Sequence, residues 1–179
     1  MPVYIALLRG INVSGHKIVK MERLRAACAA LGFTEVKTYV QSGNVIFASP
    51  DRSLVALAKR IERKILEEFG FSVPVFLTTV KELEGVIHRN PFSQKPGIDP
   101  TKLHVTFLSG DPPPTALGIL SPLAAGPEQL KVLGREIHLY CPNGYGNTKL
   151  SNTNIEKKLS VGATTRNWKT INTLLELGG

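Results

Sequence analysis

The chain has 179 residues, of which 42% are hydrophobic and 20% charged; this balance supports a packed core and excludes global disorder. No apolar run approaches the roughly 18 residues needed to cross a bilayer, so we expect no membrane partner. Two cysteines are too few for a disulfide framework, which favours a cytoplasmic location. The length suits one large domain or two small ones.

The positive charge of the chain is concentrated in two short segments. The formal net charge is +8, and residues 9–25 and 149–169 each hold five basic residues and one acidic residue. The rest of the sequence has 12 bases and 12 acids, so the two segments carry the whole excess. A clustered excess creates a local field for anions, although a pair of solvated faces would give the same pattern.

The first half of the chain has the pattern of a ferredoxin-like unit. Its apolar start reads as a strand rather than a signal peptide. Amphipathic helices end at Gly32 and Gly70, and a turn at 41–44 joins two β-rich runs. The expected elements are a strand at 3–8, a helix at 21–31, strands at 36–40 and 45–48, a helix starting at Pro50-Asp51, and a strand at 74–78. The order βαββαβ is the ferredoxin-like plan.

The second half repeats most of this plan. A short helix at 80–88 is followed by residues 89–101, which contain three prolines and a glycine and are the best linker candidate. The further expected elements are a strand at 103–108, a helix at 115–125, strands at 129–133 and 136–141, and helices at 154–159 and 166–177. We therefore predict an α+β fold with two ferredoxin-like (split βαβ) units, at 1–88 and 102–179, with antiparallel or mixed sheets under packed helices.

The topology predicts one candidate binding site. In a βαββαβ sheet the exit of the first strand lies beside the turn between the second and third strands. The exit loop also leads into the first helix, whose free N–H groups attract anions. A phosphate or carboxylate cradle is one interpretation, and a loop whose polar residues satisfy their own backbone is the other. The candidate ligand-binding residues here are Arg9, Asn12, His16, Lys17, Lys20, Gln41, Ser42 and Asn44.

A second candidate lies near the C-terminus. Thr164 or Thr165 is a suitable N-cap for the last helix, which places Arg166 and Asn167 near its positive end. Arg166 then either binds a phosphate or pairs with a carboxylate at the junction of the units. Trp168 reads as a core anchor.

Signatures of catalysis are weak. No histidine has metal-ligand spacing, and the G-x-S-x-G, H-E-x-x-H and G-x-G-x-x-G motifs are absent, so we predict no metal and no cofactor and lean against an enzyme. Cys141 would be a nucleophile only if a histidine approached it. His104 and His138 fall on strands expected to be neighbours. Asn44 stands where an RNA-recognition sheet needs an exposed aromatic residue, which disfavours that mode of binding.

Three segments resemble one bacterial family. They are ALLRGINV at 6–13, YVQSGNVIF at 39–47 and ATTRNW at 163–168. In this order they are similar to the family called domain of unknown function 1697. The resemblance implies a two-part α+β protein with ferredoxin-like elements, and it brings no catalytic residues. It points to the Arg9 loop, the Gln41 turn and the start of the last helix; Ser14 departs from the glycine that the family tends to have.

Three functions remain open from the sequence. The first is a non-catalytic binder of phosphate-rich ligands, DNA or RNA foremost. Its contacts would be Arg9, Lys17, Lys20, Arg23, Lys157, Lys158 and Arg166. The second is an enzyme or sensor for a small phosphorylated or carboxylated metabolite in a cleft between the units. The third is a protein-interaction module that uses an apolar sheet face. The oligomeric state stays open.

Overall fold

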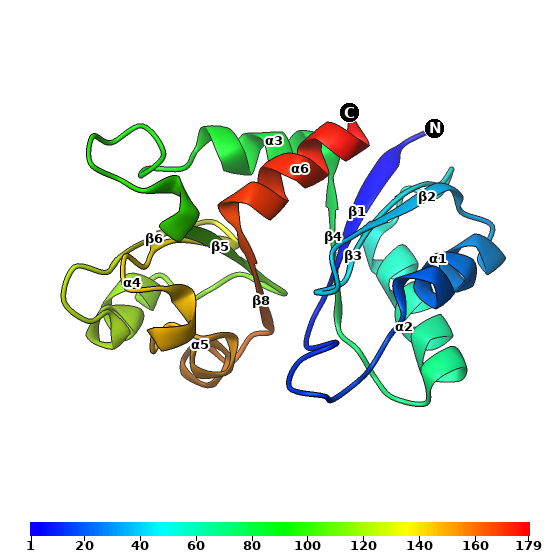
Figure 1. Ribbon diagram of the computed structural model, residues 1–179, viewed down its shortest axis with the longest axis horizontal. Helices are drawn as coiled ribbons and strands as arrows, with labels where there is room; N and C mark the ends of the chain where they lie inside the picture. The colour runs from blue at the N-terminus through cyan, green and yellow to red at the C-terminus, as the bar shows by residue number, and fades with distance from the viewer. The chain divides into compact units, whose positions relative to one another are not determined.

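The computed structural model describes residues 1–179 and has two compact units, each with a four-stranded antiparallel sheet (Figure 1). Unit 1 comprises residues 1–85 and 173–179, and unit 2 comprises residues 86–172. The predicted α+β class with two ferredoxin-like sheets is confirmed. None of the helices combines the length and the apolar character needed to span a membrane.

Unit 1 has the strand order β2-β3-β1-β4, in which every neighbouring pair is antiparallel. The helix α3 (Val80–His88) begins directly after the last strand. The other elements are β1 (Val3–Leu8), α1 (Met21–Ala30), β2 (Thr34–Tyr39), β3 (Asn44–Ala48), α2 (Leu54–Phe69) and β4 (Val75–Thr79).

The two helices α1 and α2 cover one face of this sheet (Figure 1). In α2 the buried residues Leu57, Ile61 and Ile65 recur every four positions, which makes the apolar stripe of a core-facing helix. The helix starts three or four residues later than the expected Pro50-Asp51, because Ser53 caps it by accepting a hydrogen bond from Ala56 N. It ends at Gly70, which has a left-handed backbone.

The opposite face of the unit 1 sheet is also apolar and buried. Ile5, Leu7 and Ile46 are each at most 2% exposed. The end of α6 (Trp168–Gly178) packs here, since a Cβ atom added to Gly178 would lie 3.7 Å from Ile5 Cδ1 and 2.9 Å from Val80 Cγ2. The protein-interaction alternative therefore loses the exposed sheet face on which it depended.

Unit 2 has the equivalent strand order β6-β7-β5-β8, again antiparallel throughout. The segment expected as a linker has no helix or strand before the short 3₁₀ helix Pro100–Lys102, and it is part of this unit. The other elements are β5 (Leu103–Leu108), α4 (Ala116–Leu120), β6 (Gln129–Leu133), β7 (Glu136–Tyr140), α5 (Asn152–Leu159) and β8 (Ala163–Asn167).

The strand β8 corrects the expectation for the last helix. Thr164 and Thr165 are strand residues rather than N-caps, and α6 begins at Trp168. Asn167 caps α6 instead, because its Oδ1 atom accepts a hydrogen bond from Thr170 N at 2.8 Å. The sequence of β8 has neither an apolar run nor an alternation of apolar and polar residues, so it carries no local strand signal. With β8 in place, unit 2 has the full order βαββαβ.

Candidate anion-binding surface

The exit loop of β1 and the β2–β3 hairpin turn are in direct contact, as the strand order predicts. Leu8 N donates to Gly43 O at 2.9 Å. Asn12 links the two segments, because its Nδ2 atom donates to Gln41 O at 2.8 Å and to Val19 O at 2.9 Å. Its Oδ1 atom also accepts from Val19 N at 2.8 Å. The Asn12 side chain is therefore a clamp between loop and turn, with its polar atoms already occupied.

Several residues of the loop and turn have left-handed backbone conformations. Asn12, Ser14, Lys17 and Val40 have φ angles of 54°, 51°, 48° and 53°. Asparagine adopts this region readily, whereas a β-branched valine does so at a cost. Val40 is also 45% exposed, so no burial of its side chain offsets the strain. Strain of this kind clusters at functional positions.

Gly43 allows the turn to pack closely on the loop. It has φ +89°, and a Cβ atom there would lie 2.6 Å from Ile11 Cδ1 and 2.9 Å from Leu8 Cβ. Its neighbour Asn44 is fully buried, and Asn44 Nδ2 donates to Tyr39 O at 2.8 Å and to Ser42 Oγ at 3.2 Å. Asn44 thus holds the turn from inside, while Gln41 and Ser42 are exposed at the tip.

The residues His16, Lys17, Lys20, Arg23 and Arg25 are all exposed, and the lysines and arginines among them are cations. Two of them contact the end of α2: Lys17 Nζ donates to Ser72 O at 2.7 Å, and Arg23 Nη2 donates to Glu68 O at 3.0 Å. The Arg23 guanidinium also lies over the Phe69 ring, 4.6 Å from its centroid. Arg25 donates to Thr38 Oγ1. These contacts orient the cations and leave further N–H donors on each.

The first turn of α1 adds to the positive character of this region. Its N-cap position is Lys20, and no side chain accepts a hydrogen bond from the first-turn N–H groups. Lysine is an unusual choice where serine, threonine or aspartate is preferred. Glu22 is the one acidic residue in this turn.

The second predicted cluster lies on β8 and is less accessible. Arg166 is 6% exposed, and its Nη1 atom donates to Thr164 Oγ1 at 2.8 Å and to Thr165 O at 2.9 Å. Burial lowers the pKa of Arg166 to about 10, so it stays cationic at neutral pH. Asn167 is engaged in capping α6. Lys157 and Lys158 are exposed in the last turn of α5, where the helix dipole favours cations.

In unit 2, His138 and Cys141 are buried and His104 is half-buried. His104 pairs with Leu139 and His138 pairs with Val105, which puts the two histidines on opposite faces of the sheet. Burial, with a smaller contribution from Arg89, lowers the pKa of His138 to about 4. Burial raises the pKa of the Cys141 thiol to about 11, so it stays protonated at neutral pH. No group of three or more His, Cys, Asp or Glu side chains is arranged to hold a metal ion.

Unit 2 closes the equivalent loop without an excess of charge. Leu108 N donates to Arg135 O at 2.9 Å, as Leu8 N does to Gly43 O, and Ser109 N donates to Gly162 O as Arg9 N does to Pro74 O. Here the loop and hairpin are linked by an exposed ion pair between Arg135 Nε and Asp111 Oδ1, 2.9 Å apart. Residues 109–125 contain one charged residue, Asp111, whereas residues 9–25 have a net charge of +4.

Sequence reasoning missed the apolar side chains that stand among the unit 1 cations. Val13, Ile18 and Val40 are 57%, 57% and 45% exposed. Hydrophobicity alone assigns such residues to a core. The nearby glycines and turn residues were the signal that these positions lie on a surface loop.

The fold and this surface define a two-unit ferredoxin-like α+β protein with one strongly basic exit loop. The chain belongs to the family described as "Protein of unknown function (DUF1697)", whose model matches residues 1–138. A search of curated proteins finds no match. Among solved structures, it is similar to the "conserved bacterial protein SP0830 from Streptococcus pneumoniae", with a TM-score of 0.78, 23% identity and 99% coverage of both chains. That likeness concerns the fold.

Proposed function

We propose that the protein is a non-catalytic binder of phosphate-rich polyanions, nucleic acid foremost, and that it binds through a basic loop surface on unit 1. This surface comprises the exposed side chains of His16, Lys17, Lys20, Arg23 and Arg25, with Gln41 and Ser42 at the adjacent hairpin tip. Five predicted residues lie outside this surface. Arg9 is half-buried, Asn44 and Arg166 are buried, Asn12 is engaged as the clamp, and Asn167 caps α6.

The comparison between the two equivalent loops carries this proposal. Both loops close against their hairpins by the same backbone contacts, and unit 2 does so with a single ion pair. Closure of the loop against the hairpin therefore does not require the net charge of +4 in residues 9–25. Unneeded like charges within one loop and helix repel one another, which favours a role outside the fold.

The distribution of the cations favours an extended ligand. The five basic side chains are exposed along the loop and α1, and each keeps donors for a phosphate. Exposed Val13, Ile18 and Val40 offer apolar contacts to sugars or bases between phosphates. The buried Asn44 and the absence of aromatic residues at the tip argue for binding by backbone charge rather than by base stacking.

Fluorescence anisotropy with labelled single-stranded DNA, double-stranded DNA and RNA at low salt tests the proposal. Lys17→Gln/Lys20→Gln should weaken binding to all three about equally, because phosphate contacts carry no sequence information. Lys95→Gln/Lys131→Gln removes two exposed cations of unit 2 outside both basic segments and serves as the matched control. If none of the three nucleic acids binds at low salt, the proposal is wrong.

A further inference from the structure

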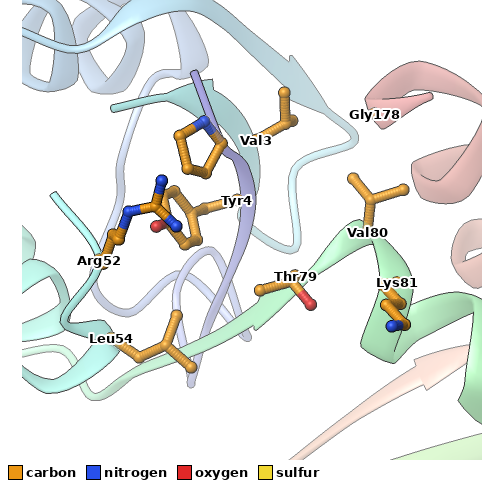
Figure 2. Close-up of a pocket in the computed structure, with 9 residues that line it drawn as sticks. Val3, Tyr4, Arg52, Leu54, Thr79, Val80, Lys81 and Gly178 are labelled. Atoms are coloured by element: carbon orange, nitrogen blue, oxygen red, sulfur yellow. The ribbon is translucent and has the colours of Figure 1, made fainter. Parts of the chain in front are cut away.

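An open surface cavity of about 490 Å³ lies in unit 1 (Figure 2), and its lining shares no residue with the basic loop surface. Its lining comes from the start of β1, the segment that leads into α2, the junction of β4 with α3, and the end of α6. Val3, Leu54 and Val80 give it apolar walls, and Arg52 and Lys81 are its charged residues. The volume falls within the range of small-molecule sites, which is about 300–1,000 Å³.

Arg52 and Lys81 are exposed residues at the mouth of this cavity. Neither Arg52 nor Lys81 has an ion pair or a side-chain hydrogen bond within the chain. Arg52 lies two residues before the start of α2, and Lys81 is the second residue of α3. Both positions face the positive end of a helix dipole, where a cation is unfavourable. An anion bound between them would offset this unfavourable placement.

The acidic groups near the cavity are already engaged. Asp51 pairs with Arg60, whose Nη1 atom lies 2.6 Å from Asp51 Oδ2. The Glu82 carboxylate accepts hydrogen bonds from Thr79 N and Thr78 Oγ1. Neither carboxylate therefore neutralises Arg52 or Lys81, and the cavity keeps a net positive lining.

One further donor faces the cavity. The Thr79 hydroxyl accepts a hydrogen bond from Glu82 N at 3.1 Å, which leaves its own hydrogen for a ligand. The Tyr4 hydroxyl is already used, because it donates to Asp51 O at 2.6 Å, so its ring acts as apolar surface. The lining thus combines two cations and one hydroxyl with a mainly apolar wall.

We infer that this cavity binds a carboxylate carried on a short apolar body. Arg52 contacts the carboxylate, Lys81 adds positive charge to the opposite side of the lining, and Val3, Leu54 and Val80 contact the body. A guanidinium matches a planar carboxylate by paired hydrogen bonds. The inference is independent of the nucleic-acid proposal, because the two surfaces share no residue.

Amide-resolved NMR titration with hexanoate tests the inference, with hexan-1-ol as the neutral analogue of the same length and inorganic phosphate as the anion without an apolar body. Saturable shifts should appear for residues 3–4 and 79–81 with hexanoate, and clearly weaker ones with the other two probes. Arg52→Gln/Lys81→Gln should weaken hexanoate binding about tenfold or more, since hydrogen bonds between charged groups are the strong ones.

The control variant Lys59→Gln/Arg63→Gln removes two exposed cations of α2 outside the cavity and should bind hexanoate as the parent does. The inference is overturned if hexanoate gives no saturable shifts at these residues, if hexan-1-ol or phosphate binds as tightly, or if the Arg52→Gln/Lys81→Gln variant binds hexanoate unchanged.

Discussion

The two units use one strand order to build two different loop–hairpin contacts. Unit 1 joins loop and turn through the neutral amide of Asn12, and four exposed cations lie in the same loop and helix. Unit 2 joins them through the exposed Asp111–Arg135 ion pair and has no other charge in the equivalent loop and helix. The difference shows that closing the loop sets no requirement for positive charge, so the charge of unit 1 is free to serve binding.

The largest expected difference in stability between the two loop–hairpin contacts comes from substituting their hairpin glycines. Gly43→Ala should destabilise unit 1 by about 4 kcal/mol, because the new Cβ meets Leu8 and Ile11 and the backbone is left-handed. Gly134→Ala in unit 2 should cost about 1 kcal/mol, since its φ of +60° is strained but the space is open.

Thiol labelling by Ellman's reagent measures these two changes separately. Each unit contains one buried cysteine, Cys28 in unit 1 and Cys141 in unit 2, and burial raises both thiol pKa values. Gly43→Ala should accelerate labelling of Cys28 and not of Cys141. Equal acceleration at both thiols would contradict the separation into two units.

A pH effect should be specific to unit 2, because its sheet buries His138. The unfolded pKa is near 6.5 and the folded pKa is about 4, so the unfolded chain binds the proton first as the pH falls. The full free energy of unfolding is present above pH 6.5, where His138 is neutral in both states. It should fall by up to about 3 kcal/mol between pH 6.5 and 4.

Urea unfolding followed by the fluorescence of Trp168, the single tryptophan, reports this effect in unit 2. The Glu136 carboxylate and Arg89 form an ion pair in the same unit. His138→Leu should flatten the pH dependence between 6.5 and 4; a variant with the parent's slope would show that another group titrates.

The Asn12 clamp should contribute more to the free energy of unfolding than the Asp111–Arg135 ion pair of unit 2 does. Asn12→Ala removes two hydrogen bonds to the buried Val19 and one to Gln41 O, and it places alanine at a positive φ, which should cost about 2 kcal/mol. Asn12→Asp keeps the acceptor for Val19 N and should cost less. In unit 2, Asp111→Ala breaks a fully exposed pair and should shift the urea midpoint less than Asn12→Ala does.

The smallest expected effect is a gain of stability at the unit 1 turn. Val40→Asn should stabilise unit 1 by about 1 kcal/mol, because asparagine adopts the left-handed region that strains an exposed valine. Val13→Asn, at an exposed position without a positive φ, should leave stability unchanged. No gain in the urea midpoint for Val40→Asn would mean that Val40 is not strained.

The elements with apolar runs or stripes could be predicted from the sequence, whereas β8 could not. Strands such as β5 and β6 match their expected bounds because their residues alternate or cluster as apolar runs. Pairing with β5 sets β8, and that long-range contact leaves no mark on the local pattern.

The candidate site was predictable only in part. Strand order alone placed the exit loop beside the hairpin turn. It did not show that Asn44 is buried, that Asn12 is occupied as a clamp, or that Lys17 and Arg23 reach the end of α2. These roles depend on tertiary contacts between distant segments. Asn12 and Gln41 are 29 residues apart in the sequence, and Lys17 and Ser72 are 55 apart.

The most direct test of the account is the salt dependence of nucleic-acid affinity. We predict that the logarithm of the association constant falls linearly with the logarithm of the salt concentration. Lys17→Gln/Lys20→Gln should make the slope shallower by about 2, and Lys95→Gln/Lys131→Gln should leave it unchanged. Equal slopes for both variants, or a parent affinity that does not respond to salt, would contradict a polyanion surface on the basic loop of unit 1.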